Sequence, residues 1–259
     1  MRKIYLAAIF ICITLLFVSC TIEENRSEAA IIEEQVLKSG SEDSSYVELN
    51  KIKDIIWVHT TYADYNGYRT PSNGLVIETS GGLVMIDTPW NNEQTKELIK
   101  LTKSKFNKNF TLAIITHAHE DRIGGINMLL ENKIDVKSTI LTSQLAEQYG
   151  YKKPTPSLDS DPNIKIGDAS IEVFYPGEGH SEDNIVVWIP KDKVLFGGCI
   201  VKDQNSESLG STKDANLEQW PISLNRVLEK YHDADAVIPG HGNWGSIELI
   251  NHTLELLKQ

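Results

Sequence analysis

The segment THAHEDRIGG, residues 116–125, decides how this sequence is interpreted. It follows an apolar run at 112–115 and precedes a helical pattern at 125–132. Alternate side chains of an extended backbone share a face, so a turn at the end of a strand can aim His117, His119 and Asp121 into one cleft. Imidazole and carboxylate are ligands that Zn²⁺ prefers. A bare His-x-His is more often an exposed loop, but the aspartate and the strand–turn–helix context favour a metal site.

Three further residues with metal-binding side chains occur in similar settings. His180 ends the segment GEGH, Cys199 ends FGGC, and His241 lies in PGHG, each after a strand-like run and beside glycine. Glycine permits close approach of the backbone and unusual dihedral angles. Any one of these residues alone would more often be structural. Three protein ligands plus water are usual for a catalytic zinc, so six such residues suggest two metals, each with an open position.

The remaining cysteines and histidines limit this interpretation. The chain has three cysteines, Cys12, Cys20 and Cys199. If Cys12 leaves with an export signal and Cys20 is blocked by a lipid, Cys199 is a lone thiol, either buried and inert or held by a metal. The other histidines lack a glycine at a strand end and are predicted to be surface or structural residues; they are His59, His232 and His252.

The N-terminus has the pattern of an export signal. Arg2 and Lys3 precede an apolar run at 4–19 that ends in Val-Ser before Cys20. This pattern resembles a bacterial lipoprotein signal, in which Cys20 becomes the lipidated first residue. A plain secretory signal cut nearby and a retained transmembrane anchor are the alternatives. We therefore predict a signal peptide at 1–19, an acidic tether at 20–45 and a folded domain at 46–259, in an exported, periplasmic protein anchored through Cys20.

Composition and charge exclude several functions. The 259 residues are 41% hydrophobic and 24% charged, which are ordinary values for a globular protein. Loss of Arg2 and Lys3 would reduce the 25 basic residues to 23 against 36 acidic ones, giving a net charge of −13. Such a chain is repelled by nucleic acid and by anionic lipid. We expect a monomer with no nucleic-acid partner, in contact with a membrane only through the lipid on Cys20.

The periodicity of the sequence predicts a mixed α/β fold. Groups of strands alternate with helices in both halves, which favours sheet packed against sheet with helices outside. A hairpin-like turn is expected at 80–82, a polar and aromatic loop at 61–74, and a cap at Ser246. Strands are expected at 54–60, 74–78, 83–87, 112–115, 164–166, 170–175, 184–189, 193–196 and 236–238. Helices are expected at 92–105, 125–132, 143–149, 217–231 and 246–257.

Together, the motifs HAHEDR, GEGHSEDNIVVW, FGGCIVK and PGHG resemble those of the metallo-β-lactamases, in particular their first, di-zinc subclass. The similarity runs from about residue 47 to the C-terminus. Much of the wider superfamily has histidine after the motif aspartate and a bridging aspartate later; here the residues are Arg122 and Cys199, which favour the lactamase subclass. The resemblance implies a four-layer αβ/βα sandwich with the zinc site at the edge between the two sheets.

The resemblance also implies a site with two Zn²⁺ ions. His117, His119 and His180 would hold one zinc, and Asp121, Cys199 and His241 the other. Asp121 would have a catalytic role as well, orienting the water that opens the lactam ring. The implied activity is hydrolysis of the β-lactam amide bond of penicillins and cephalosporins, with carbapenems also expected, conferring antibiotic resistance.

Substrate contacts are implied at three places. Lys202, three residues after Cys199, would pair with the carboxylate of the antibiotic, unless it is simply a solvated lysine. Ser211 stands where the family often has an asparagine that contacts the substrate or its oxyanion. A mobile flap would cover the substrate, unless it is an ordinary exposed turn; its aromatic residues are Tyr62, Tyr65 and Tyr68.

Two other functions remain in competition. The first is another hydrolase of the same fold, acting on a lactone, thioester or phosphoester, against which Arg122 and Cys199 argue. The second is a zinc-binding surface lipoprotein without activity. A structural zinc site is closed and usually has four ligands, so the set of six residues argues against it.

Overall fold

The computed structural model describes residues 36–39, 46–65 and 67–259. The predicted signal peptide, Cys20 and most of the predicted tether lie outside these residues. Within the tether range, residues 36–39 form the short strand β1 (Val36–Ser39). In the described part of the chain, no helix is both long and apolar enough to cross a membrane.

The larger sheet has eight strands in sequential order. Its first strands pair antiparallel from β2 to β5, whereas β5 to β8 pair parallel. Helices follow the parallel strands, as parallel connections require. The strands after β1 are β2 (Val47–Lys51), β3 (Ile56–Tyr65), β4 (Tyr68–Thr79), β5 (Gly82–Ile86), β6 (Phe110–Ile114), β7 (Asp135–Ser138) and β8 (Thr155–Pro156), and the helices are α2 (Asn92–Phe106), α3 (Glu120–Ile123), α4 (Ile126–Glu131) and α5 (Ile140–Gln148).

The smaller sheet has five strands in the order β13-β12-β11-β10-β9. All neighbours in it are antiparallel except β12 and β13, which are parallel and are joined through α6. Its elements are β9 (Asn163–Ile166), β10 (Ala169–Phe174), β11 (Val186–Ile189), β12 (Val194–Gly198), α6 (Trp220–Lys230), β13 (Ala236–Pro239) and α7 (Glu248–Leu256).

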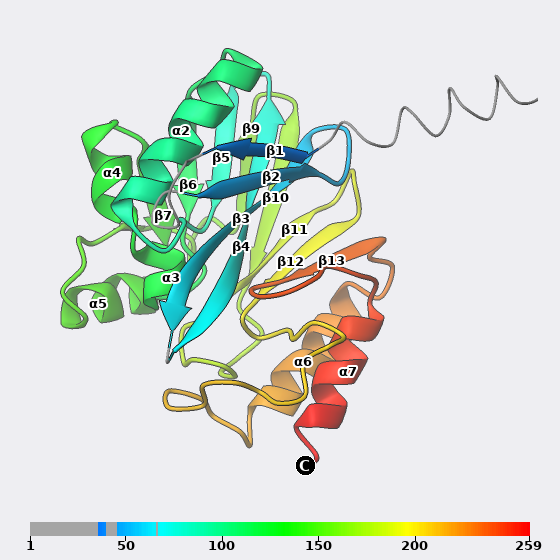
Figure 1. Ribbon diagram of the computed structural model, residues 1–259. Helices are drawn as coiled ribbons and strands as arrows, with labels where there is room; N and C mark the ends of the chain where they lie inside the picture. Colours follow the sequence, from blue (N-terminus) through cyan, green and yellow to red (C-terminus); the bar gives the residue numbers. More distant parts are fainter. Residues whose placement is uncertain (1–35, 40–45, 66) are drawn as a thin grey trace, which may run out of the picture. The chain divides into compact units, whose positions relative to one another are not determined.

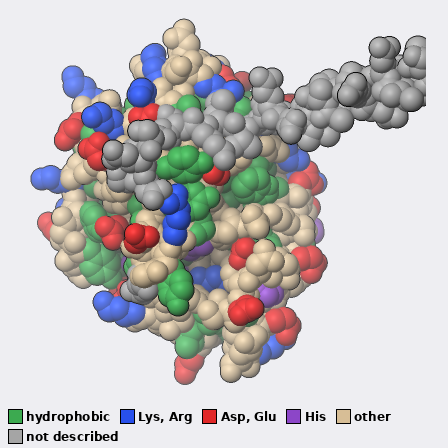
Figure 2. Space-filling model, viewed as in Figure 1, with side chains coloured by type: hydrophobic (Ala, Val, Ile, Leu, Met, Phe, Trp, Pro, Cys, Tyr) green, Lys and Arg blue, Asp and Glu red, His purple; other side chains and the backbone are tan. Residues whose placement is uncertain are grey.

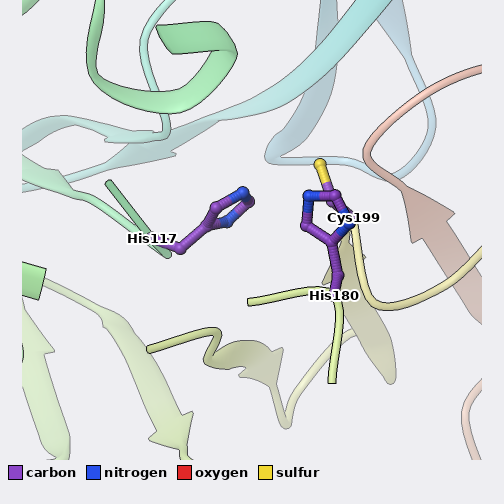
Figure 3. A group of neighbouring side chains, drawn as sticks. All are labelled: His117, His180 and Cys199. Carbon is purple, nitrogen blue, oxygen red and sulfur yellow. The ribbon is translucent and has the colours of Figure 1, made fainter. Parts of the chain in front are cut away.

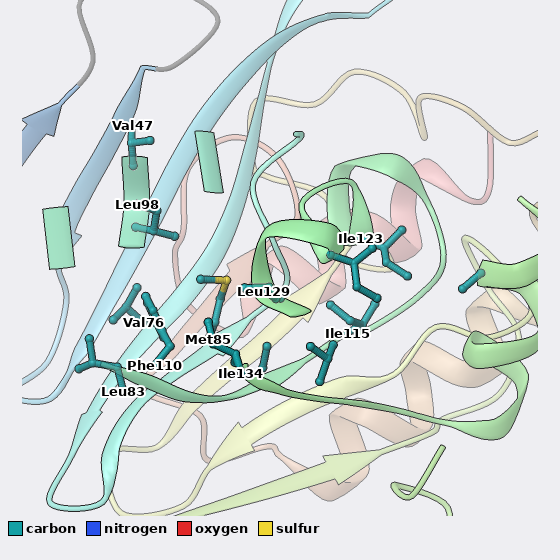
Figure 4. Packing of buried hydrophobic residues seen from close by; sticks show 14 of the residues in the cluster. Val47, Val76, Leu83, Met85, Leu98, Phe110, Ile115, Ile123, Leu129 and Ile134 are labelled. Atoms are coloured by element: carbon teal, nitrogen blue, oxygen red, sulfur yellow. The ribbon is translucent and has the colours of Figure 1, made fainter. Parts of the chain in front are cut away.

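Three hydrophobic cores separate four layers. One lies between the larger sheet and helices α2 to α5 and includes Trp57 of β3. Figure 4 shows part of this core, with Met85 and Leu98 among its residues. The second lies between the sheets and takes Ile56 and Val58 from the opposite face of β3. The third lies between the smaller sheet and α6 and α7. The two groups of helices are on opposite sides of the sheets (Figure 1), which confirms the predicted four-layer sandwich.

The segment 61–74, predicted as a loop, is instead most of a hairpin. Strands β3 and β4 pair as far as Tyr65 and Tyr68, and Gly67 has a φ of +79°, which glycine adopts without steric cost. The prediction was wrong because the outer half of the hairpin is half-exposed on both faces and has no hydrophobic alternation. The prediction also missed β1, β2, β7, β8 and α3, which are each five residues or shorter. Helix α7 begins at Glu248 with Ile247 at the cap position, so the cap predicted at Ser246 was one residue early, although the Glu248 N–H lies 3.3 Å from Ser246 Oγ.

Candidate active site

The six predicted metal-binding residues lie in the segments that follow the strands β6, β10, β12 and β13. His117 and His119 follow β6, and Asp121 lies in the first turn of α3. His180 follows β10, whereas Cys199 and His241 come just after the parallel strands β12 and β13. The ends of the two sheets meet here, and the structure brings all six side chains together.

Three imidazoles form the first group. The ring centroids of His117, His119 and His180 are 4.8–5.2 Å apart, and Nδ1 of His119 is 3.1 Å from Nε2 of His180. The Nε2 atom of His117 is buried and has no hydrogen-bond partner among the described residues. Figure 3 shows the rings of His117 and His180 turned toward each other, with the Cys199 thiol beside them.

The second group combines a carboxylate, a thiol and an imidazole. The Sγ atom of Cys199 is 3.4 Å from Oδ2 of Asp121 and 3.4 Å from Nε2 of His241. That Nε2 atom is 3.2 Å from the same carboxylate oxygen. The potential ligand atoms of the three residues all lie within 4.8 Å of one another, as expected for the donors of one metal ion.

The protonation states of both groups suit zinc. Burial lowers the pKa of His117 and of His180 well below the ordinary value, so both imidazoles are neutral, which is the form that binds metal. Burial raises the pKa of the Cys199 thiol, so the residue is protonated in the absence of a metal, and a bound cation would deprotonate it. With an orphaned nitrogen on His117 and a set of N, S and O donors, the residues fit zinc.

Arg122 orients the carboxylate of the second group. It is fully buried, and its Nε and Nη2 atoms lie 2.8 and 2.7 Å from Oδ2 of Asp121. Its guanidinium also donates to Ser72 Oγ and to the carbonyl oxygens of Asn73 and Gly240. Burial disfavours ionisation of Asp121, but the charge of Arg122 together with the interactions of His241 and His117 holds the pKa of the carboxyl well below its usual range. Asp121 is therefore ionised and fixed in place.

A cleft of about 750 Å³ opens above the two groups. Tyr65 and Tyr68 of the β3–β4 hairpin line it on one side, and residues 206–211, including Ser211, line it on another. Lys202 also lines the cleft although it is only 8% exposed, and burial lowers its pKa. The hollow near the centre of Figure 2 has histidine atoms at its bottom, with a cationic side chain beside them.

The predicted substrate contact Tyr62 does not line the cleft. Its ring packs 6.1 Å from that of Tyr46, and the guanidinium of Arg69 lies 4.8 Å from its centroid. Side chains alternate along a strand, so Tyr62 and Tyr65, three residues apart, point to opposite faces of β3. The sequence pattern had grouped the tyrosines by their closeness along the chain.

Among the cleft residues that sequence reasoning missed, Asp214 and Trp90 contact the metal-binding histidines. Asp214 places Oδ2 3.2 Å from Nε2 of His119 and so orients that ring. Trp90 packs between Tyr65 and His241, with ring centroids 6.0 and 6.3 Å away. A usable signal existed for Trp90, because it follows the predicted strand at 83–87 as the six metal-binding residues follow theirs.

The other three histidines lie outside both groups. His59 is fully buried, with Nε2 3.1 Å from the carbonyl oxygen of Asp87. His232 is exposed, and His252 is partly buried beside the carbonyl oxygen of Ser206. These positions agree with their prediction as surface or structural residues.

Comparison with known proteins agrees with this geometry. Residues 67–241 match the metallo-beta-lactamase superfamily. The chain is 46% identical over 252 residues to a metallo-beta-lactamase type 2 of Bacillus cereus, covering 96% of each chain. A metallo-beta-lactamase type 2 of Bacillus sp. (strain 170) is 44% identical over 262 residues, covering 100% of each. The solved metallo-beta-lactamase from Pontibacter korlensis superposes with a TM-score of 0.80 at 39% identity, covering 82% of this chain and 99% of that one. The chain belongs to the metallo-beta-lactamase superfamily and binds zinc.

Proposed function

We propose that this protein is a zinc-dependent β-lactamase that hydrolyses the amide bond of penicillins, cephalosporins and carbapenems and so confers resistance to them. One observation carries the proposal: six side chains with nitrogen, oxygen or sulfur donors come together beneath a cleft wide enough for a small molecule, and four of them line it. The relatives named metallo-beta-lactamase type 2 match this chain along its whole length, which supports the substrate class.

Two zinc ions fit the division of the donors. His117, His119 and His180 would hold one ion, and Asp121, Cys199 and His241 the other. When bound, zinc supplies Lewis-acid chemistry, because it polarises a carbonyl group and lowers the pKa of water from 15.7 to about 7. The Asp121 carboxylate, ionised and fixed by its buried guanidinium partner, is suited to orient the attacking water.

The walls of the cleft would bind and orient the antibiotic. The Lys202 ammonium would pair with the carboxylate on the fused ring of the substrate, a charge-assisted interaction strengthened by burial. Tyr65 and Tyr68 would cover an apolar face of the substrate and exclude water. The Ser211 hydroxyl would donate a hydrogen bond to the substrate or its oxyanion.

Steady-state hydrolysis by the purified protein tests this function. We expect turnover of a penicillin, a cephalosporin and a carbapenem, loss of turnover in excess chelator, and recovery when zinc is returned. Faster turnover of a lactone, thioester or phosphoester than of all three antibiotics would favour the alternative hydrolase.

Metal analysis tests the two-zinc assignment. Two zinc ions per chain are expected, falling to one in Cys199→Ala. The matched control is His232→Ala, which changes an exposed histidine outside both groups and should retain two ions. One ion per chain in the unmodified protein at saturating zinc would refute the assignment.

We also propose that the protein is exported to the periplasm and anchored by a lipid on Cys20. The support is the basic start, apolar run and Val-Ser-Cys end of residues 1–20. Cells fed a labelled fatty acid should label the protein and retain it in the membrane fraction. Both properties should be lost in Cys20→Ser, and an unlabelled parent protein would contradict the anchor.

A further inference from the structure

The wall of the cleft at residues 206–211 is tied to Asp203, a residue that does not itself line the cleft. The Asp203 side chain is buried, and its Oδ1 accepts a hydrogen bond of 2.5 Å from the hydroxyl of Ser206. The Asp203 carbonyl oxygen accepts from the Ser206 N–H at 3.1 Å. These two bonds fix the start of the wall as a tight turn.

The other carboxylate oxygen of Asp203 contacts the turn that carries His241. Oδ2 of Asp203 accepts from the N–H of Asn243 at 3.3 Å. Gly242, the residue between His241 and Asn243, has a φ of +78°, and a Cβ atom built there would lie 2.5 Å from the Asp203 carboxylate. A glycine is therefore required both by the backbone conformation and by the close approach of this carboxylate.

The Gly242 turn is held by further bonds. Asn73 donates through Nδ2 to the carbonyl oxygen of Gly242 at 2.8 Å, and Nδ1 of His241 lies 2.6 Å from the carbonyl oxygen of Pro71. The turn is thus anchored to β4 on one side and to Asp203 on the other. A displacement on the Asp203 side would tilt the His241 ring.

Helix α7 supports the same wall from behind. Nε2 of His252 lies 2.9 Å from the carbonyl oxygen of Ser206, and the N–H of Lys202 donates to Thr253 Oγ1 at 2.8 Å. Both ends of the segment 202–206 are therefore fixed to one helix. Asp203 is the residue of this segment whose side chain reaches the metal-binding turn.

We propose that Asp203 is a positioning residue that couples the substrate-binding wall to the turn of His241. Through one carboxylate it sets the spacing between the wall, which includes Ser211, and a donor of the second metal group. This inference rests on the proposed function, because it assigns Asp203 a part in binding both the antibiotic and zinc.

Substitution of Asp203 tests the coupling with two readouts. In Asp203→Ala we expect the KM for a penicillin to rise about tenfold and the Kd of the more weakly bound zinc, measured by competition with a chromogenic chelator, to rise about tenfold. Asp203→Asn should keep both values within about threefold of the parent, because its amide can accept from Asn243 and donate to Ser206 Oγ. The matched control is Gln204→Ala, the exposed neighbour, which should change neither value.

The outcomes separate coupling from a purely structural role. A lower melting temperature with KM and zinc Kd both within twofold of the parent would overturn the proposal. If Asp203→Ala does not fold, Ser206→Ala serves instead, because it removes only the hydroxyl on the wall side. Coupling predicts that zinc binds about threefold more weakly to this variant. An unchanged zinc Kd would contradict the coupling. If the parent hydrolyses no β-lactam, the proposed function fails, while the zinc Kd values still decide the coupling.

Discussion

His59 makes the folded chain sensitive to acid at a residue that belongs to neither metal group. Its ring is fully buried on β3, and a carbonyl oxygen can only accept, so Nε2 carries the proton in the 3.1 Å bond to Asp87. Nδ1 is buried without a partner among the described residues. Burial, and to a lesser extent the Arg122 charge, lower the pKa of His59 from 6.5 to about 4. Protonation would place an unpaired charge in the interior.

The sign and size of the effect follow from proton linkage. Between pH 6.5 and 4 the unfolded chain binds the proton at His59 and the folded chain does not. The contribution of neutral His59 to the free energy of unfolding is therefore fully present above pH 6.5 and is lost as the pH falls toward 4. A pKa lowered to about 4 means that acidification through the whole range lowers the free energy of unfolding by about 3.4 kcal/mol. At pH 5 the loss is about 2 kcal/mol.

Urea unfolding of the parent and of His59→Gln, in excess chelator at pH 7.5 and 5.0, measures this contribution. Glutamine can still donate a hydrogen bond to the Asp87 carbonyl but does not titrate. Other titrating groups are common to both proteins, so we expect the parent to lose about 2 kcal/mol more free energy of unfolding than the variant. If the parent and the variant lose the same free energy of unfolding to within about 0.5 kcal/mol, the acid sensitivity does not come from His59.

Three further substitutions have definite expected results. A Cβ atom built on Gly74 would lie 2.2 Å from Nε2 of His59, so Gly74→Ala should lower the free energy of unfolding by about 1–3 kcal/mol, and an unchanged melting temperature would contradict this packing. Lys202→Met keeps an apolar stem without the charge, and should raise the KM for a penicillin about tenfold while leaving that for its carboxylate ester unchanged; equal effects on both would argue against the carboxylate contact. Ser211→Asn should raise kcat/KM by less than about a hundredfold, the scale of one oxyanion donor, and a larger gain on every antibiotic would mean that this donor matters more than we infer.

Most of the fold and the metal-binding residues could be predicted because their signals are local. Each strand around the site is a short apolar run, and each of the six metal-binding residues follows such a run closely. The outer β3–β4 hairpin could not be predicted, because it is stabilised by cross-strand pairing rather than by burial of one face.

Side-chain direction and contacts between distant segments were beyond the sequence pattern. Tyr62 faces away from the cleft because β3 continues through residue 65 and side chains alternate along a strand, whereas the loop predicted at 61–74 implied no alternation. Asp203 meets Asn243 across 40 residues of sequence, and neither residue shows a periodicity that would pair them. Arg122 served only as a marker that distinguishes related families, whereas the structure gives it a physical role as the partner of Asp121.

The placement of the site across both sheets has a mechanical consequence. The N-terminal half of the domain provides His117, His119 and Asp121, and the C-terminal half provides His180, Cys199 and His241. Each proposed donor group mixes residues of the two halves, so neither half alone contains a complete set. A bound cation would therefore cross-link the two halves of the domain. Removal of the metal would weaken the packing of one sheet against the other as well as stop turnover.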